Sequence, residues 1–168
     1  FSEKSKQFWF ASTPTIDKEI KSRFEKVWEQ ASSGDFGSWR ETAEGSVALI
    51  IILDQFPLNM FRSEAKGFST EGMAIEVALN AINNGFDEEL DNEMLLFLFM
   101  PLMHSENLDH QNLQVYLFEK YNFNLEFSKH HRDLVKKFGR FPHRNEILGR
   151  MSTMEELDYL LSDNAFKG

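Results

Sequence analysis

Apolar residues recur at helical spacing along most of this chain. The clearest case runs from Ile16 to Ala31, where positions three and four residues apart would share one helix face. Gly34 follows at the place of a C-terminal cap. Further helices are predicted over 59–66, from a cap at Ser69 or Thr70 to Gly85, and over 92–100, 109–121, 125–138 and 154–161. No stretch alternates apolar and polar residues over a strand's length, which argues against a sheet.

The most apolar stretch is Val47 to Leu53, seven residues long. We expect Ser46 to cap a helix through this stretch and Pro57 to end it near Phe56. A segment that is apolar on every side predicts the most buried helix of the protein. Seven residues are far fewer than the roughly twenty that a membrane-spanning helix needs, so we expect no membrane span.

Several breaks mark where the other helices begin or end. Phe8-Trp9-Phe10 closes a short amphipathic opening segment before the first long helix. Pro101 is expected to end the helix that starts at Asn92. Gly139 is expected to end the helix over 125–138. Ser152 and Glu155 have the spacing of a capping box at the start of the last helix. About eight helices joined by short links therefore predict an all-α fold of antiparallel helix pairs, forming a single domain over 1–168.

Composition supports a folded core of large rings. The chain is 42% hydrophobic and 14% aromatic, with 17 phenylalanines. The net charge of −9 argues against nucleic-acid or anionic-membrane binding through the whole surface, because both need a positive field. The chain has no cysteine, which excludes disulfides and thiolate metal sites. We expect a cytoplasmic protein.

The positive charge gathers in one part of the chain. Between Lys129 and Arg150 lie seven lysines and arginines and two acidic residues, a local charge of +5. Within this region the stretch Phe138 to Asn145 places two arginines, a histidine and an amide around a Gly/Pro break, which is typical of a polar site. Similar clusters occur at other expected helix ends. The candidate ligand-binding residues are Asp54, Gln55, Asn59, Arg62, His104, Glu106, His131, Arg140, His143, Arg144, Asn145 and Arg150.

Two of these charges oppose the expected helix dipoles. Asp54 falls near a predicted C-terminus, and Arg144 falls in the first turn after Pro142. Each such charge costs about 0.5–1 kcal/mol unless a partner compensates it. In one interpretation Asp54 pairs with Arg140 or Arg144 and holds the helices together. In the other, the arginines and the free N–H groups after Pro142 bind an external anion, and both can hold at once.

Histidines could instead carry proton transfer. His104 or His143 can act as a general acid or base, oriented by Glu106 or Asp54. The His-Glu-x-x-His spacing of a zinc site is absent, so we expect neither a metal nor another cofactor.

Three motifs resemble one bacterial family. They are Leu53-Asp54-Gln55-Phe56-Pro57 with Asn59 and Phe61-Arg62, then Met100 to Glu106, and then Arg140 to Asn145 with Leu148-Gly149-Arg150. Together they are similar to the family called domain of unknown function nine-two-four, and the likeness runs from Phe8 to the final helix. The resemblance implies a tetratricopeptide-like, all-helical repeat fold and no particular activity. Leu58 stands where that family usually has arginine, so an arginine there is not essential to a shared function.

The sequence thus favours a helical protein that binds a small anionic ligand or a peptide carboxylate through residues at helix ends. The alternatives are a hydrolase- or lyase-like enzyme that uses His104 or His143, and a scaffold that binds a protein partner through an exposed apolar groove.

Overall fold

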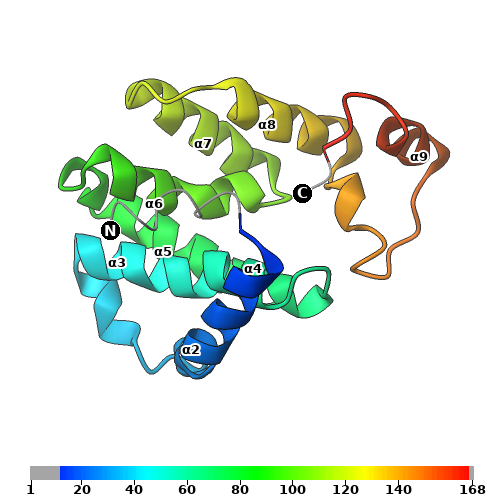
Figure 1. The fold of residues 1–168 in the computed structure, drawn as a ribbon. Coiled ribbons are helices and arrows are strands. Elements are labelled where there is room, and N and C mark those ends of the chain that lie inside the picture. Colours follow the sequence, from blue (N-terminus) through cyan, green and yellow to red (C-terminus); the bar gives the residue numbers. More distant parts are fainter. Residues whose placement is uncertain (1–11, 167–168) are drawn as a thin grey trace. The chain divides into compact units, whose positions relative to one another are not determined.

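The structure, a computed structural model, describes residues 12–166 and is helical throughout its regular elements (Figure 1). None of the described residues lies in a β-strand, which confirms the predicted all-α class. The expected opening segment at Phe8-Trp9-Phe10 lies outside the described residues. Backbone contacts divide the chain into an N-terminal unit, residues 1–86, and a C-terminal unit, residues 87–168, and each is described by itself. One domain over 1–168 and the tetratricopeptide-like arrangement stay predictions.

The N-terminal unit begins with the long helix α2 (Pro14–Ser33). Thr13 caps its start, and Gly34 ends it with a φ of 93°, a left-handed conformation that glycine adopts without strain, as predicted. The elements that follow are η1 (Gly37–Glu41), α3 (Ala43–Ile50), the π-turn η2 (Ile51–Gln55), α4 (Phe56–Met60), η3 (Ala65–Phe68) and α5 (Glu71–Asn83).

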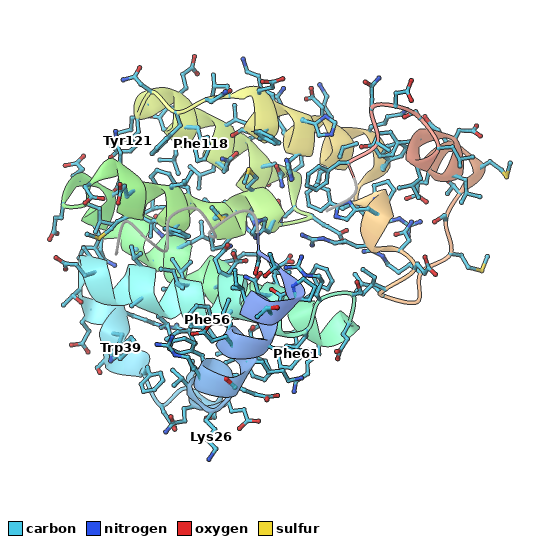
Figure 2. The ribbon with its side chains drawn as sticks, viewed as in Figure 1. Lys26, Trp39, Phe56, Phe61, Phe118 and Tyr121 are labelled. Atoms are coloured by element: carbon cyan, nitrogen blue, oxygen red, sulfur yellow. The ribbon has the colours of Figure 1, made fainter. Side chains whose placement is uncertain are left out.

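Aromatic rings join α2 to α4. Phe56 and Phe61, labelled in Figure 2, meet Phe24 and Trp28 of α2 at ring-centroid distances of 4.7 and 5.1 Å. Trp28 also donates through its Nε1 to the hydroxyl of the buried Thr70, 3.1 Å away. Large rings thus form one part of the core of this unit, and most of its other buried apolar residues are aliphatic, such as Ile50, Leu53 and Val77.

The apolar stretch differs from its prediction at both ends. Thr42, not Ser46, caps α3: its backbone is extended and its hydroxyl accepts the N–H of Gly45 at 3.2 Å. Pro57 does not end the helix, because it lies in the first turn of α4, where a missing N–H is tolerated. The predicted helix over 59–66 is wrong too, since α4 ends at Met60.

Asp54 is part of the π-turn that links α3 to α4, and only 3% of its surface is exposed. The N–H of Phe56 reaches back five residues to the carbonyl of Ile51, which defines this turn. Because α4 continues the chain, Asp54 is not at a free helix C-terminus. The dipole argument for Asp54 is therefore wrong.

The C-terminal unit starts in the short η4 (Phe86–Glu88) and contains α6 (Asn92–His104), α7 (Leu108–Lys120), α8 (Glu126–Phe138), η5 (Pro142–Arg144) and α9 (Met154–Leu160). Helix α7 packs against both α6 and α8 (Figure 1). Phe118 and Tyr121, labelled in Figure 2, place their rings 6.4 and 5.7 Å from Phe99 of α6.

Helix ends in this unit were predicted with mixed success. Gly139 closes α8 with a φ of 72°, as expected. Pro101 does not end α6, which continues to His104. Pro101 and Leu102 are buried, and this burial offsets the hydrogen bond that the proline removes. The capping box lies one residue later than predicted, at Thr153 and Glu156. No helix within residues 12–166 is both long and apolar enough to cross a lipid bilayer.

Candidate functional site

The loop that follows α8, residues 139–153, carries most of the predicted candidates in the C-terminal unit. It is held by Phe141, whose ring is fully buried against Leu134 and Val135 of α8. The guanidinium of Arg144 lies over this ring, 4.7 Å from its centroid. The turn after Pro142 is a 3-10 helix of three residues, so Arg144 ends a very short element instead of opening a regular helix.

Glu106 binds this loop at two places. Arg150 donates from Nη1 to Oε2 at 2.6 Å and from Nη2 to Oε1 at 2.9 Å, and the backbone N–H of Phe141 donates to Oε1 at 2.7 Å. Burial raises the pKa of Glu106, but these hydrogen bonds and the charges of Arg150 and Arg144 outweigh it, so its pKa lies below the usual value. Glu106 is therefore an ionised anchor for the loop.

Arg140 has a carboxylate partner of its own. It donates from Nε and Nη2 to the two oxygens of Glu156, at 2.6 and 2.8 Å, and from Nη2 to the carbonyl of Met151 at 2.9 Å. The hydrogen bonds from Arg140 and from the Thr153 N–H hold the pKa of Glu156 at about 2. The need of Arg140 for a carboxylate was foreseen, but its partner Glu156 was not.

Three histidines surround one aromatic ring near this loop. The ring centroids of His131 and His143 lie 4.5 and 5.0 Å from that of Phe166, and that of His130 lies 6.1 Å away. Burial and the positive charge of Arg144 lower the pKa of both His131 and His143 to about 4. For His131 this happens although its Nδ1 donates a hydrogen bond to the Phe127 carbonyl, which acts to raise the pKa. Both imidazoles are neutral at pH 7.

Some hydrogen-bonding atoms in the loop are buried without a partner among the described residues. They are Nδ1 of His143, Nε of Arg150 and Oδ1 of Asn145. The amide nitrogen of Asn145 does have one, because it donates to Ser152 at 3.0 Å. A buried polar atom left unpaired costs about 1–3 kcal/mol, so each of these atoms calls for an explanation.

The end of α6 adds His104 to this neighbourhood, and its charge acts on the pKa of His131. His110 is engaged elsewhere, since its Nδ1 lies 2.9 Å from the hydroxyl of Ser105. No group of three or more His, Asp or Glu side chains suited to a metal ion occurs within residues 12–166.

The other four candidates belong to the N-terminal unit. Gln55 donates to Asp54 at 2.5 Å, and Asn59 donates to the Gln55 carbonyl at 2.9 Å. Arg62 donates to both oxygens of Asp17, at 2.8 and 3.1 Å. The hydrogen bonds and charge of Arg62, with a hydrogen bond from Ser12, hold the pKa of Asp17 below its usual value against the effect of burial. Arg62 thus has an internal partner.

The structure brings together eight of the predicted residues within the C-terminal unit: His104, Glu106, His131, Arg140, His143, Arg144, Asn145 and Arg150. Sequence reasoning missed Phe141, Phe166 and Glu156. Phe141 stood inside a chosen motif and could have been selected as the apolar anchor of a polar loop. Nothing local distinguishes Phe166 or Glu156 from other residues of their type.

Comparisons with known proteins agree with this fold. The chain matches a family model described as bacterial protein of unknown function (DUF924) over residues 1–164. It is similar to a solved structure of a protein of unknown function from Agrobacterium tumefaciens, with 34% identity, a TM-score of 0.89, and coverage of 96% of this chain and 92% of that one. A comparison with curated proteins gives no match.

Proposed function

This chain belongs to the family of bacterial proteins of unknown function (DUF924), as its three motifs predicted, and we propose that it is a binding protein for anions. The site is the loop after α8, and the ligand presents an oxygen anion, either as a small molecule or as the carboxyl end of a peptide. Because no activity comes with the family, the proposal rests on the chemistry of the loop.

One observation carries the proposal: Nδ1 of His143 is buried without a hydrogen-bond partner within residues 12–166, beside charges that favour an anion. The charges of Arg144 and Arg150 lower the pKa of His143 and together outweigh the opposite effect of Glu106, so the ring lies in a positive potential. An anionic oxygen accepting from His143 would satisfy Nδ1 and add the negative charge that this potential favours.

The paired arginines have a supporting role in this proposal. Arg140 and Arg150 each donate two hydrogen bonds to a carboxylate, Glu156 and Glu106 respectively, so they hold the loop in shape. A loop held by two such pairs is preorganised, which lowers the entropy that a ligand must overcome on binding. Nδ1 of His143 and Nε of Arg150 are buried without a partner among residues 12–166, and we assign the ligand to these two donors.

The low pKa of His131 and His143 favours binding over acid–base catalysis. A general acid or base works best with a pKa near the working pH, and both rings have pKa values of about 4. At pH 7 neither ring carries the acidic second proton of an imidazolium, and both are weak bases. The enzyme alternative therefore depends on His104, which shares the unit.

Calorimetric titration tests the proposal with three probes: inorganic phosphate, a short peptide with a free carboxyl end, and the same peptide with an amidated end. We expect the wild-type protein to bind phosphate, the free peptide or both, and to bind the amide at least about tenfold more weakly than the free peptide, from the worth of a charged hydrogen bond. His143→Phe should lose about tenfold or more in affinity for the bound probe.

His130→Phe is the matched control, because His130 contacts the same Phe166 ring yet was never a candidate. It should bind as the wild type does. His143→Phe should keep or raise the melting temperature, since it removes an unsatisfied buried nitrogen. Saturable binding that is equal in the wild type and His143→Phe would refute the assignment, and so would a wild type that binds none of the probes.

A further inference from the structure

The N-terminal unit contains a hollow of about 330 Å³, distinct from the loop after α8. It lies where the end of α2, the short η1 and the helix α3 with its π-turn come together. Its lining residues are Ala31, Gly34, Phe36, Gly37, Arg40, Leu49 and Leu53. The volume is at the lower end of the range for small-molecule sites, about 300–1,000 Å³.

The hollow has an apolar floor. Ala31, Leu49 and Leu53 are all at least 97% buried, and they come from α2, α3 and the π-turn. Leu53 belongs to the π-turn that links α3 to α4. Such turns within helices occur often at functional sites.

Arg40 is the single charged residue of the lining. Its partly buried guanidinium forms no hydrogen bond and no ion pair with any of residues 12–166. Glu41 is next in the chain and Glu44 is four residues on, yet neither pairs with it. The backbone carbonyl of Arg40 accepts from the Asn80 side chain at 3.3 Å. Every other arginine considered above has an internal contact, so Arg40 is a charge available to a ligand.

Two glycines, Gly34 and Gly37, belong to the lining of the hollow. A Cβ atom added at Gly34 or Gly37 would meet no atom within 4 Å. Gly34 is needed for its left-handed backbone, but Gly37 has no such requirement, so its missing side chain leaves space. Beside the rim, Phe36 and Trp39 stack at 4.7 Å, and Trp39 (Figure 2) is 37% exposed.

We propose that this hollow binds a small monocarboxylate with an apolar body. The carboxylate pairs with the two-pronged guanidinium of Arg40, and the apolar part lies on Ala31, Leu49 and Leu53. A single arginine suits a single negative charge. A phosphate dianion fits less well, because the C-terminal end of α2, with its partial negative charge, lies at the same rim.

Hexanoate and its uncharged analogue 1-hexanol are suitable probes, followed by backbone NMR shifts of the full-length protein and by Trp39 fluorescence. Hexanoate is expected to bind saturably and to shift residues 31–53. Arg40→Met, which keeps the apolar stem but removes the charge, should weaken hexanoate binding about tenfold or more and leave hexanol unchanged. Arg23→Met is the matched control, because Arg23 is a surface arginine of α2 paired with Glu19, and it should bind hexanoate as the wild type does.

A second variant fills the space and leaves Arg40 in place. Gly37→Leu adds a side chain where a Cβ meets no neighbour, so the fold should persist while both probes bind more weakly. Three outcomes overturn the proposal: no saturable binding by the wild type, equal hexanoate affinity in Arg40→Met, or shifts confined to residues 87–168. The first two outcomes leave the proposal for the loop after α8 untouched, and the third would place hexanoate in the C-terminal unit, so the two proposals fail separately.

Discussion

Glu106 and Arg150, 44 residues apart in the chain, are joined by two hydrogen bonds of 2.6 and 2.9 Å, and about three quarters of each side chain is buried. The same carboxylate accepts the backbone N–H of Phe141 at 2.7 Å. Glu106 therefore connects the end of α6 to both ends of the loop that contains His143. The geometry of the candidate site depends on this pair.

A double-mutant cycle measures the strength of the pair. Glu106→Gln and Arg150→Met should each destabilise the protein, and the coupling free energy between them should be about 1–2 kcal/mol, as for a two-pronged, partly buried ion pair. Urea unfolding of the four proteins gives this value. The control cycle is Glu19 with Arg23, an exposed pair on α2 at 3.0 Å, for which we expect about 0.5 kcal/mol or less. Equal coupling in the two cycles would contradict the role given to Glu106.

Thr70 satisfies two buried polar groups of the N-terminal unit. Its hydroxyl donates to the Leu53 carbonyl at 2.6 Å and accepts from Trp28 Nε1 at 3.1 Å. Thr70→Val keeps the shape but leaves both groups unpaired, so we expect a loss of about 2 kcal/mol in the free energy of unfolding. Thr70→Ser keeps the hydroxyl and should lose less. If valine and serine cost the same, packing and not hydrogen bonding would explain the effect.

The protein should lose stability in two steps as the pH falls. His131 and His143 have a pKa of about 4 when folded and 6.5 as the ordinary value, so the unfolded state binds more protons between these limits. Stability from the neutral rings is complete above pH 6.5 and is lost as the pH falls towards 4. The lowered pKa values of Glu106, Asp17 and Glu156 add a second loss below their ordinary values of 4.5 and 3.8.

Urea unfolding at pH 7, 6 and 5 checks the first step. His131 alone should account for about 2 kcal/mol between pH 7 and pH 5. His131→Phe, which keeps a ring at this position, should flatten the pH dependence by that amount. The matched exchange His130→Phe should leave the slope in place. A wild-type stability that is constant from pH 7 to pH 5 would disprove the low pKa values.

Local sequence predicted some of the helix ends correctly and others wrongly. Gly34 and Gly139 were predicted correctly because a left-handed residue after a helix is a local backbone requirement that glycine meets at little cost. Pro57 and Pro101 were predicted by the same local reasoning to end helices, but both lie inside helices. At Pro57 the helix is restarted by a π-turn, and at Pro101 burial of the neighbouring side chains offsets the lost hydrogen bond.

The partners of the charged residues could not be predicted from local sequence. The sequence indicated that Arg140 needed a negative partner, but Glu156 was not among the residues considered for it. The capping box that orders Glu156 was expected one residue earlier, so the carboxylate that reaches Arg140 was overlooked. Arg40 was not considered at all, because an arginine without a partner is visible only once its surroundings are known.

The sequence by itself determined the all-helical class, most of the helices and the family, because these follow from apolar periodicity, glycine and proline positions and local motifs. It also identified the loop from Arg140 to Arg150 as a place of concentrated polar chemistry. Only the tertiary structure decided which carboxylate each arginine meets, which histidines are buried enough to stay neutral, and that Arg40 faces an apolar hollow. Pairing and desolvation depend on residues tens of positions apart, and local sequence carries no information on which of them meet.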